Sequence, residues 1–463
     1  MPQAETVALP KRLPIILNPE NRSESTGKDA RLVNGYMEKM PSGEYQLYSR
    51  PGTLLDSRPP GANAAGYGSF NWLGDVYSVF GTALYKNGTS IGTTDATNGV
   101  YRFSSSSGTT PRLVLGNGVK AYTYDGTTFA QITDPDFPTA FYKGWSYLDK
   151  TTYVMSTPNK INGSDLDNPT AWDSLNLINA QIAPDKGVGL DKQLVYTVAF
   201  KQWTTEVFYD AQNSTGSPMG TVQGAKINFG AASIETVQDI DGSLYWVATN
   251  RNSSPQIIRV DNLKPSIIST PAVERILDGA DFTACFSWTI KEWGHWFYVL
   301  TLKTDNITLA YDTKEGLWSQ WTDTDGNYFP IVSSTYNSSG VHILQHETNG
   351  KLYLAKGTYV NDDGSLFTVD MYLPNFDGGT RRRKQLNVMT FVGDQTPGSV
   401  IQVRGSDDDY QTWSNFRNVY MEKKKPLLTN CGTFEKRAYH LRHRCNARLR
   451  LQAIELQMDL GTL

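Results

Sequence analysis

Pairs of strand-like runs joined by a short polar turn are the feature that most restricts how this chain can fold. Residues 296–302 and 307–311 alternate apolar and polar side chains on either side of a turn at 303–306, and the chain restarts at Trp318 after a Tyr-Asp turn. Such alternation, with turn residues between the runs, predicts a β-hairpin. The same order returns at residues 121–129. A chain assembled from such units is a β scaffold, and any activity has to be argued separately from the fold.

The composition favours the same architecture along the whole chain. The 463 residues include 40 Gly and 25 Tyr, and only 19% are charged, whereas helix bundles need more Ala, Leu, Glu and Lys at helical spacing. Polar turn clusters such as residues 250–255 separate short runs of Val, Ile, Tyr and Trp. Units of roughly 40–45 residues match four-stranded propeller blades. We therefore predict an all-β fold: a β-propeller of six blades with an additional smaller β domain. Because no crisp motif repeats, the blades are expected to be divergent.

Changes in composition give the expected domains. Residues 1–30 are rich in Pro, Asn, Ser and charge, and predict an extended N-terminal arm. We expect the β-propeller, with insertions, over residues 31–380 and a basic C-terminal β domain over residues 381–463. Part of the segment 31–60 is expected to pack with that second domain.

Three segments depart from the hairpin pattern. Residues 211–232 are rich in Gly, Ser and Asn, and predict a polar insertion rather than core strands. Residues 270–277 are the most helix-like piece, with Thr270 as the N-cap and Pro271 in the first turn. Within residues 165–179 we expect one helical turn.

Charge is distributed unevenly along the chain. Residues 381–450 contain 15 Lys and Arg against 6 Asp and Glu, a net charge of +9, and the rest carries 28 basic and 40 acidic residues. A basic C-terminal region on an acidic body favours a polyanion or an acidic protein as neighbour. A solvated basic face without a partner explains the segregation equally well.

The basic residues form two consecutive runs and one alternating series. From Arg442 to Arg450 the basic residues alternate as in a strand, where their even spacing can place all four guanidinium groups on one face as a ladder. Such a ladder needs a polyanion or an acidic partner to neutralise it, which favours a subunit interface or passing DNA over local carboxylate pairing. The candidate polyanion or subunit-interface residues are Arg381, Arg382, Arg383, Lys384, Lys423, Lys424, Lys425, Arg442, Arg444, Arg448 and Arg450.

No motif for catalysis, a cofactor or a metal stands out. No GxxxxGK[ST] phosphate loop occurs. On a strand, His342 and His346 would lie ~13 Å apart, too far to share a metal by themselves. His440, His443 and Cys445 do not have a zinc-finger spacing. We therefore expect no catalytic residues, no metal, no cofactor and no enzymatic activity.

The cysteines and the apolar runs bear on the compartment. Three cysteines, an odd and sparse set, do not make a disulfide framework and indicate synthesis in a reducing cytosol. Pro10 and Pro14 interrupt the first apolar run, so a signal peptide is not expected. No stretch approaches ~18 apolar residues, so we expect no membrane insertion.

One motif supports a different function. Residues 406–413 resemble a degenerate Asp-box, with Tyr410 in place of glycine. In sialidase-type propellers that motif is a structural turn away from catalysis, and we favour a turn role here. A glycosidase would need two facing carboxylates, which the sequence cannot pair in space. A carbohydrate-binding or glycosidase-type β-propeller acting on host surface glycans is the alternative, and the 11 Trp support it.

An ordered series of short motifs resembles a known family. The motifs are Asn34-Gly35-Tyr36, Arg50-Pro51-Gly52, Ala83-Leu84-Tyr85, Leu115-Gly116-Asn117-Gly118, Tyr122-Thr123-Tyr124-Asp125, Asp134-Pro135-Asp136-Phe137, Ser269-Thr270-Pro271-Ala272-Val273-Glu274 and Tyr311-Asp312 before Trp318. From about residue 31 to 460 this succession resembles the tail hub, or packaged-DNA stabilisation, proteins of short-tailed bacteriophages, also called tail accessory factors. Order and spacing produce the resemblance, and the 211–232 insertion and the basic C-terminal tip depart from the pattern.

The resemblance implies a non-enzymatic structural protein of the virion. It implies a homo-hexameric ring, the tail nozzle or hub, which closes the portal-adaptor channel and retains packaged DNA. The implied partners are the portal-adaptor ring, tail fibre or spike proteins, a tail plug or needle, and genomic DNA crossing the channel without sequence specificity. The implied location is the virion tail, with assembly in the host cytoplasm. In this setting Trp318 and Trp321 are expected to pack blades rather than to form sugar platforms.

Overall fold

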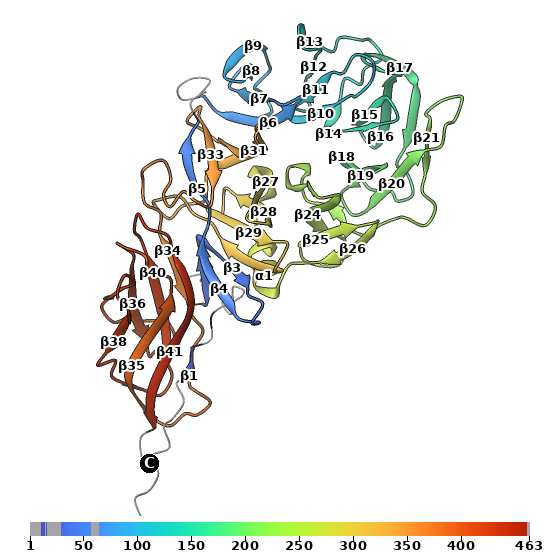
Figure 1. The fold of residues 1–463 in the computed structure, drawn as a ribbon. Helices are drawn as coiled ribbons and strands as arrows, with labels where there is room; N and C mark the ends of the chain where they lie inside the picture. The colour runs from blue at the N-terminus through green and yellow to red at the C-terminus, as the bar shows by residue number, and fades with distance from the viewer. Residues whose placement is uncertain (1–10, 14, 16–28, 57–63, 461–463) are drawn as a thin grey trace, which may run out of the picture.

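Consecutive antiparallel meanders build most of the molecule (Figure 1). The computed structural model describes residues 11–13, 15, 29–56 and 64–460. Six separate sheets of four or five strands follow one another, and many of their hairpins turn through residues with positive φ, such as Leu73 and Gly74. Their strands are β6 (Gly66–Trp72), β7 (Asp75–Phe80), β8 (Ala83–Lys86) and β9 (Thr89–Thr93); β10 (Arg102–Ser105), β11 (Leu113–Gly116), β12 (Ala121–Tyr124) and β13 (Phe129–Gln131); β14 (Phe141–Leu148), β15 (Thr151–Ser156), β16 (Lys160–Asp165) and β17 (Asn168–Asn179); β18 (Gly187–Gln193), β19 (Tyr196–Lys201), β20 (Thr205–Asp210) and β21 (Met219–Thr221); β22 (Gly230–Ala231), β23 (Gln238–Ile240), β24 (Ser243–Thr249), β25 (Gln256–Asp261) and β26 (Lys264–Ile267); and β31 (Ile331–Tyr336), β32 (His342–His346), β33 (Leu352–Lys356) and β5 (Gly52–Leu55).

A further meander lies between the fifth and sixth of these sheets. It consists of β27 (Cys285–Glu292), β28 (His295–Leu302), β29 (Ile307–Asp312) and β30 (Leu317–Gln320). The inner strands form a ring, with β10 against β6 and β14, β14 against β18, β27 against the 3-10 helix η2 (Ile234–Thr236) and β31, and β31 against β6. The predicted all-β propeller is therefore confirmed. It has six separate blades and, in β27–β30, a further blade position whose sheet continues outside the ring.

The ring is closed by a strand from early in the chain. β5 pairs antiparallel with β33, and Leu54 lies opposite Leu354. The last blade is therefore completed by residues that precede the first one in sequence, which removes an unpaired edge from the ring.

A second, smaller β unit lies beside the propeller, as predicted (Figure 1). Two sheets enclose one core that includes Leu32, Met371 and Ile454. Both sheets combine strands from before residue 60 with strands from the C-terminal part. One sheet contains β3 (Gly35–Lys39), β4 (Tyr45–Ser49), β41 (Arg450–Leu460), β35 (Lys384–Gly393) and β38 (Leu427–Thr429), with β1 (Lys11–Arg12) on β41 and β39 (Thr433–Phe434) on β35; the other contains β2 (Arg31–Val33), β34 (Val369–Tyr372), β40 (Ala438–His443), β36 (Val400–Ser406) and β37 (Arg417–Tyr420).

One continuous sheet joins the two units. Val33 of β2 pairs in parallel with Gln320 of β30 and antiparallel with Asp370 of β34. The resulting order, β27-β28-β29-β30-β2-β34-β40-β36-β37, runs from the propeller into the second unit. Backbone hydrogen bonds, and not only a linker, therefore connect them.

Large aromatic side chains pack between the blades. Trp318 and Trp321 are each 1% exposed. The Trp318 Nε1–H donates to the carbonyl oxygen of Ile268 at 2.9 Å, and the Trp321 ring lies 5.9 Å from that of Trp288. The prediction that both tryptophans are blade-packing residues is confirmed.

Of the two helix predictions, one is confirmed and one is wrong. Helix α1 (Pro271–Asp278) begins as predicted, with the Thr270 side chain accepting from the Val273 N–H. Residues 165–179 hold no helical turn, because most of them form β17. The register of β17 on β16 shifts twice, and such bulges break the apolar alternation that would have identified a strand. No helix in the described part of the chain is long and apolar enough to cross a membrane.

Candidate functional site

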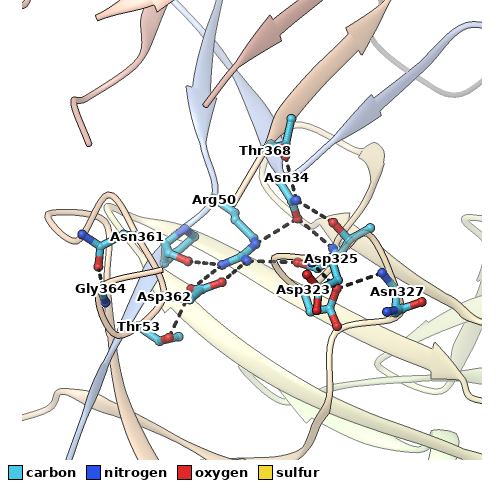
Figure 2. Close-up of polar contacts among 12 residues, drawn as sticks. Asn34, Arg50, Thr53, Asp323, Asp325, Asn327, Asn361, Asp362, Gly364 and Thr368 are labelled. Carbon is cyan, nitrogen blue, oxygen red and sulfur yellow. Dashed lines mark hydrogen bonds and ion pairs between the residues drawn. The ribbon is translucent and has the colours of Figure 1, made fainter. Parts of the chain in front are cut away.

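A buried arginine lies where the propeller meets the second unit (Figure 2). The Arg50 side chain has no exposed surface, and its guanidinium carbon lies 4.4 Å from the ring centroid of Phe329 and 4.1 Å from that of Phe367. Two of its donors reach the carboxylate of Asp362 at 3.1 and 2.5 Å. Burial of a guanidinium is tolerated only when it is paired and hydrogen-bonded, and this bidentate contact supplies the pairing.

The other three donors of Arg50 reach three further acceptors. They are Oδ1 of Asn34 at 2.9 Å and the carbonyl oxygens of Pro51 at 2.9 Å and Thr322 at 3.0 Å. All five N–H groups are therefore satisfied. Asn34, at a φ of +55°, donates from its side chain to Thr322 Oγ1 at 2.7 Å and to the carbonyl oxygen of Thr368 at 2.8 Å. The Asn-Gly-Tyr and Arg-Pro-Gly motifs thus meet at one joint with a propeller loop and with the segment that leads into β34.

Gly52 allows the chain to pass close to this joint. A Cβ atom at position 52 would lie 2.4 Å from the carbonyl oxygen of Asn361 and 2.6 Å from that of Tyr359. Real contacts of that kind do not occur, so only glycine fits. The Arg-Pro-Gly motif therefore combines a buried cation with the close approach that starts the closing strand β5.

A second polar cluster connects the same two units around a buried histidine. Nδ1 of His295 lies 2.6 Å from Oδ2 of Asp312, and its Nε2 lies 3.5 Å from Oε1 of Glu38 in β3. Lys314 donates to the same Glu38 oxygen at 3.1 Å. Burial raises the pKa of Glu38, but the hydrogen bond and charge of Lys314 and the nearby His295 lower it, with a net shift below the ordinary value. The Tyr-Asp turn thus also supplies a contact between the units.

The arginine ladder predicted between Arg442 and Arg450 is wrong. β40 ends at His443, β41 begins at Arg450, and the two strands belong to different sheets. The connection between them buries Leu449. The four guanidinium groups therefore do not share one strand face, and no single partner has to neutralise them together.

Arg442 is paired inside the second unit. Its Nε–H donates to Oδ1 of Asp370 at 3.0 Å, and the same oxygen lies 2.5 Å from Nε2 of His440. Arg404 donates to Nδ1 of His440 at 2.8 Å, which requires a neutral ring with its proton on Nε2. Burial lowers the pKa of His440 in agreement with this, although Asp370 opposes the shift.

Arg448 contacts the propeller, Arg450 is bonded within the second unit, and Arg444 is exposed. The Arg448 guanidinium lies 4.6 Å from the ring centroid of Trp293, in the β27–β28 turn. Arg450 donates to Oε1 of Gln46 at 2.9 Å. Arg444 and Arg442 line a groove of about 600 Å³ whose other lining residues include Asp305, Asp323 and Asp325. Aspartates there would repel DNA, so this groove suits a protein contact better than a polyanion.

The two basic runs lie near opposite ends of β35. Arg381, Arg382 and Arg383 are exposed just before its first residue. Lys423, Lys424 and Lys425 are exposed in the turn between β37 and β38, where Gln395, beyond the last residue of β35, donates to the Lys424 carbonyl oxygen at 3.3 Å. The ten-residue strand spans about 33 Å. The basic region is thus two clusters rather than one.

Lys384 is not available to a polyanion. It is 1% exposed, and its ammonium group donates to the carbonyl oxygens of Thr380 and Arg382 at 2.6 Å each. Its role is to fix the loop that presents the arginines.

The axis of the propeller is filled by side chains. Arg102 on β10 donates across it to the carbonyl oxygen of Val237 at 3.1 Å, and Glu235 lies 3.5 Å from Arg102 Nε and 2.8 Å from Lys143 Nζ. The remaining cavity of about 200 Å³ is lined by residues that include Ser69 and Ser287. That space is too small for nucleic acid.

The histidines lie in separate environments. Burial lowers the pKa of His342 and of His346 to about 4. His443 contacts Ser399 Oγ at 3.1 Å, whereas His440 belongs to the Asp370 network. Over the residues that the structure describes, no group of three or more His, Cys, Asp or Glu is placed to hold a metal ion.

The Asp-box-like segment forms a turn of the second unit, between β36 and β37. Asp408 Oδ1 accepts from Ser406 Oγ at 2.8 Å and from the Thr412 N–H at 2.9 Å. Hydrogen bonds from Thr412 and Ser406 lower the Asp408 pKa to about 2. Trp413 packs on Tyr410. The turn role is confirmed, and this carboxylate is occupied by its own turn.

Arg50 and Arg102 carry no sequence signal that by itself marks them as structural centres. Arg50 appeared only as part of an ordered motif, and its partners Thr322 and Asp362 lie about 270 and 310 positions later. An arginine directly before Pro-Gly, at the start of a strand-like run, was the one local signal of a buried cation.

A family model that describes a β-propeller matches most of the chain. Residues 19–354 match the family described as bacteriophage P22 Gp10, β-propeller. No curated protein matches the chain. A streptogramin B lyase structure is similar at 12% identity and a TM-score of 0.41, covering 66% of this chain and 97% of that one. The WD40 β-propeller domain of Doa1 is similar at 11% identity and a TM-score of 0.40, covering 66% and 96%.

A third similar structure is the extracellular domain of a putative hybrid two component system from B. thetaiotaomicron. It shares 10% identity and a TM-score of 0.44, covering 91% of this chain and 62% of that one. These similarities to solved structures say nothing of what this chain binds. The family match covers most of the sequence. The chain therefore belongs to the family of the bacteriophage P22 Gp10 β-propeller, and it is a structural protein of a phage.

Proposed function

We propose that this protein is the tail nozzle or hub of a short-tailed bacteriophage, a homo-hexameric ring without enzymatic activity. In this proposal the ring closes the portal-adaptor channel, retains the packaged DNA and anchors tail fibres or spikes. The observation that supports it beyond the family is the joint between the two units, made by a continuous sheet and the fully bonded Arg50. A stiff two-part subunit suits a ring that must withstand the pressure of packed DNA.

The proposed partners are those that the resemblance to tail hub proteins implies. The ring binds the portal-adaptor ring, tail fibres or spikes, and a plug or needle, and it joins the virion tail after assembly in the host cytoplasm. Because Arg102 fills the propeller axis, DNA passes between subunits, along the axis of the ring. Within the described residues, Arg381, Arg383, Lys424 and Lys425 have no carboxylate partner, which leaves them for phosphates or acidic subunits.

Assembly is the first test. The purified protein, alone and mixed with its adaptor ring, is examined by native mass spectrometry and negative-stain microscopy. A six-fold ring seated on the adaptor is the expected result. A protein that stays monomeric with the adaptor present would contradict the proposal.

The basic clusters are tested by a charge-matched pair of variants. Lys424→Ala/Lys425→Ala is compared with Lys160→Ala/Lys264→Ala, two exposed lysines of the propeller. If the first pair contacts DNA, the slope of log affinity against log salt falls by about two for that variant only. Equal slopes in both variants would assign the cluster to solvent or to a protein neighbour.

The alternative, a carbohydrate-active propeller, is weakened by the Asp-box-like turn and by the burial of two of the tryptophans. The Asp-box-like carboxylate is occupied by a turn outside the blades, and Trp318 and Trp321 are buried. Sugar release by the purified protein, lost on carboxylate substitution, would restore the enzymatic version.

A further inference from the structure

A groove of about 590 Å³ opens between the fourth and fifth blades. One wall comes from Lys226, Asn228 and Phe229, within the polar insertion at residues 211–232. The other comes from Asn250, Arg251 and Asn252, in the polar turn before β25. The segment between β21 and β22 and the turn between β24 and β25 thus face each other across one concave surface.

Two aromatic rings line the groove. Trp203 and Phe229 are both half-buried, and in the described part of the chain neither ring stacks on another aromatic side chain. A half-exposed indole beside a phenyl ring offers a flat apolar platform in a concave site, the usual form of a small-ligand pocket. The apolar face of a pyranose ring matches such a platform.

The rim offers unoccupied polar groups. Asn228, Asn252, Lys226 and Arg251 are exposed, and no side-chain hydrogen bond or ion pair is described for them within residues 64–460. Asn250 Oδ1 accepts from the N–H groups of Asn252 and Ser253, which leaves its NH₂ group for a ligand. Amides both donate and accept, as neighbouring sugar hydroxyls require, and the two cations favour an anionic substituent.

The one carboxylate that lines the groove is already engaged. Asp185 accepts from the N–H groups of Trp203 and Thr204 at 2.8 and 2.9 Å, and its Oδ1 lies 3.0 Å from the buried Lys201 Nζ. These contacts fix the backbone of Trp203. Glycoside hydrolysis needs two carboxylates free to exchange protons or attack, so this groove suits binding without cleavage.

We propose that the groove binds an acidic saccharide of a cell-surface glycan. A pyranose ring stacks on Trp203, the asparagines bond its hydroxyl groups, and its carboxylate faces Lys226 and Arg251. Single-stranded nucleic acid fits less well, because it needs an extended cationic track with successive stacking platforms, and this groove has only two cations. The proposal stands independently of ring assembly and adds a glycan contact to the same subunit.

The test uses the full-length protein and a defined probe. Binding of a galacturonic acid trisaccharide is measured by titration calorimetry, with a galactose trisaccharide as the neutral match. The acidic trisaccharide is expected to bind at least ten times more tightly. Trp203→Ala should weaken it about tenfold, equivalent to about 1.4 kcal/mol, whereas Tyr336→Ala, which removes an exposed ring on β31, should leave it unchanged.

A second variant keeps the test independent of folding. Lys226→Gln/Arg251→Gln alters two exposed side chains and should reduce affinity for the acidic probe to that of the neutral one. The proposal is overturned if neither this probe nor any acidic glycan on an array of bacterial polysaccharides binds. It is also overturned if both variants bind like the wild type, or if an oligothymidylate binds as tightly, which would assign the groove to nucleic acid.

Discussion

Replacing Arg50 with alanine tests the joint between the propeller and the second unit. The change removes five hydrogen bonds and leaves the Asp362 carboxylate without its cation. Removing one partner of a buried ion pair costs about 3–5 kcal/mol. Unfolding entropy of about 2.1 cal/mol/K per residue amounts to about 1 kcal/mol/K for 463 residues. Arg50→Ala should therefore lower the Tm by about 3–5 °C when the chain unfolds as one unit.

Scanning calorimetry measures this shift against two controls. Arg259→Ala removes a half-exposed arginine, 3.0 Å from Asp261, and should cost under about 1 kcal/mol. Arg50→Lys keeps the charge but not the planar fork, so it should also be destabilised. The reasoning fails if Arg50→Ala melts within 1 °C of the wild type or no lower than Arg259→Ala. A lysine variant as stable as the wild type would show that charge alone, without the five-donor geometry, holds the joint.

Three further changes test other parts of the structure. Gly52→Ala places a Cβ atom against the carbonyl oxygens of Asn361 and Tyr359 and should cost about 1–3 kcal/mol in denaturant unfolding, whereas Gly279→Ala, with open space around it, should not. Burial lowers the pKa of His443 to about 4 in the folded protein, so as the pH falls the imidazole is protonated in the unfolded chain before it is protonated in the folded one. The stability that the neutral His443 contributes is therefore complete above about pH 6.5. Between that pH and about pH 4 the free energy of unfolding falls by about 1.4 kcal/mol per pH unit. The stability of His443→Asn should therefore depend less on pH over that window. Trp318→Ala should cost about 3–5 kcal/mol and leave saccharide binding unchanged, and a small effect on stability would contradict its role in blade packing.

Local sequence pattern predicted the hairpins well, because each depends on residues close together. The runs at 296–302 and 307–311 became β28 and β29, and Thr270 capped α1. β17 was missed because its bulges disturb the period of two on which strand recognition depends. The arginine ladder was predicted from spacing alone, and that prediction is wrong because the segment from Arg442 to Arg450 contains a connection between two sheets.

The joint and the groove were beyond prediction for a different reason. Arg50 is satisfied by groups at positions 34, 322 and 362, and nothing local in a sequence pairs such distant residues. The saccharide groove likewise needs Trp203, the 211–232 insertion and the turn at residues 250–255 to meet in space. The polarity of the last two segments was visible in the sequence, but their proximity was not.

The early strands have a consequence for biosynthesis. β4 pairs with β41 and β5 with β33, so strands that leave the ribosome first must wait for almost the whole chain before they find their partners. Such distant pairing is slow to form, and the waiting strands expose edges that can capture other chains. A polypeptide released early from translation would therefore yield neither a closed propeller nor a completed second unit. The pairing that stiffens the finished subunit also ensures that only complete chains present a finished surface for assembly.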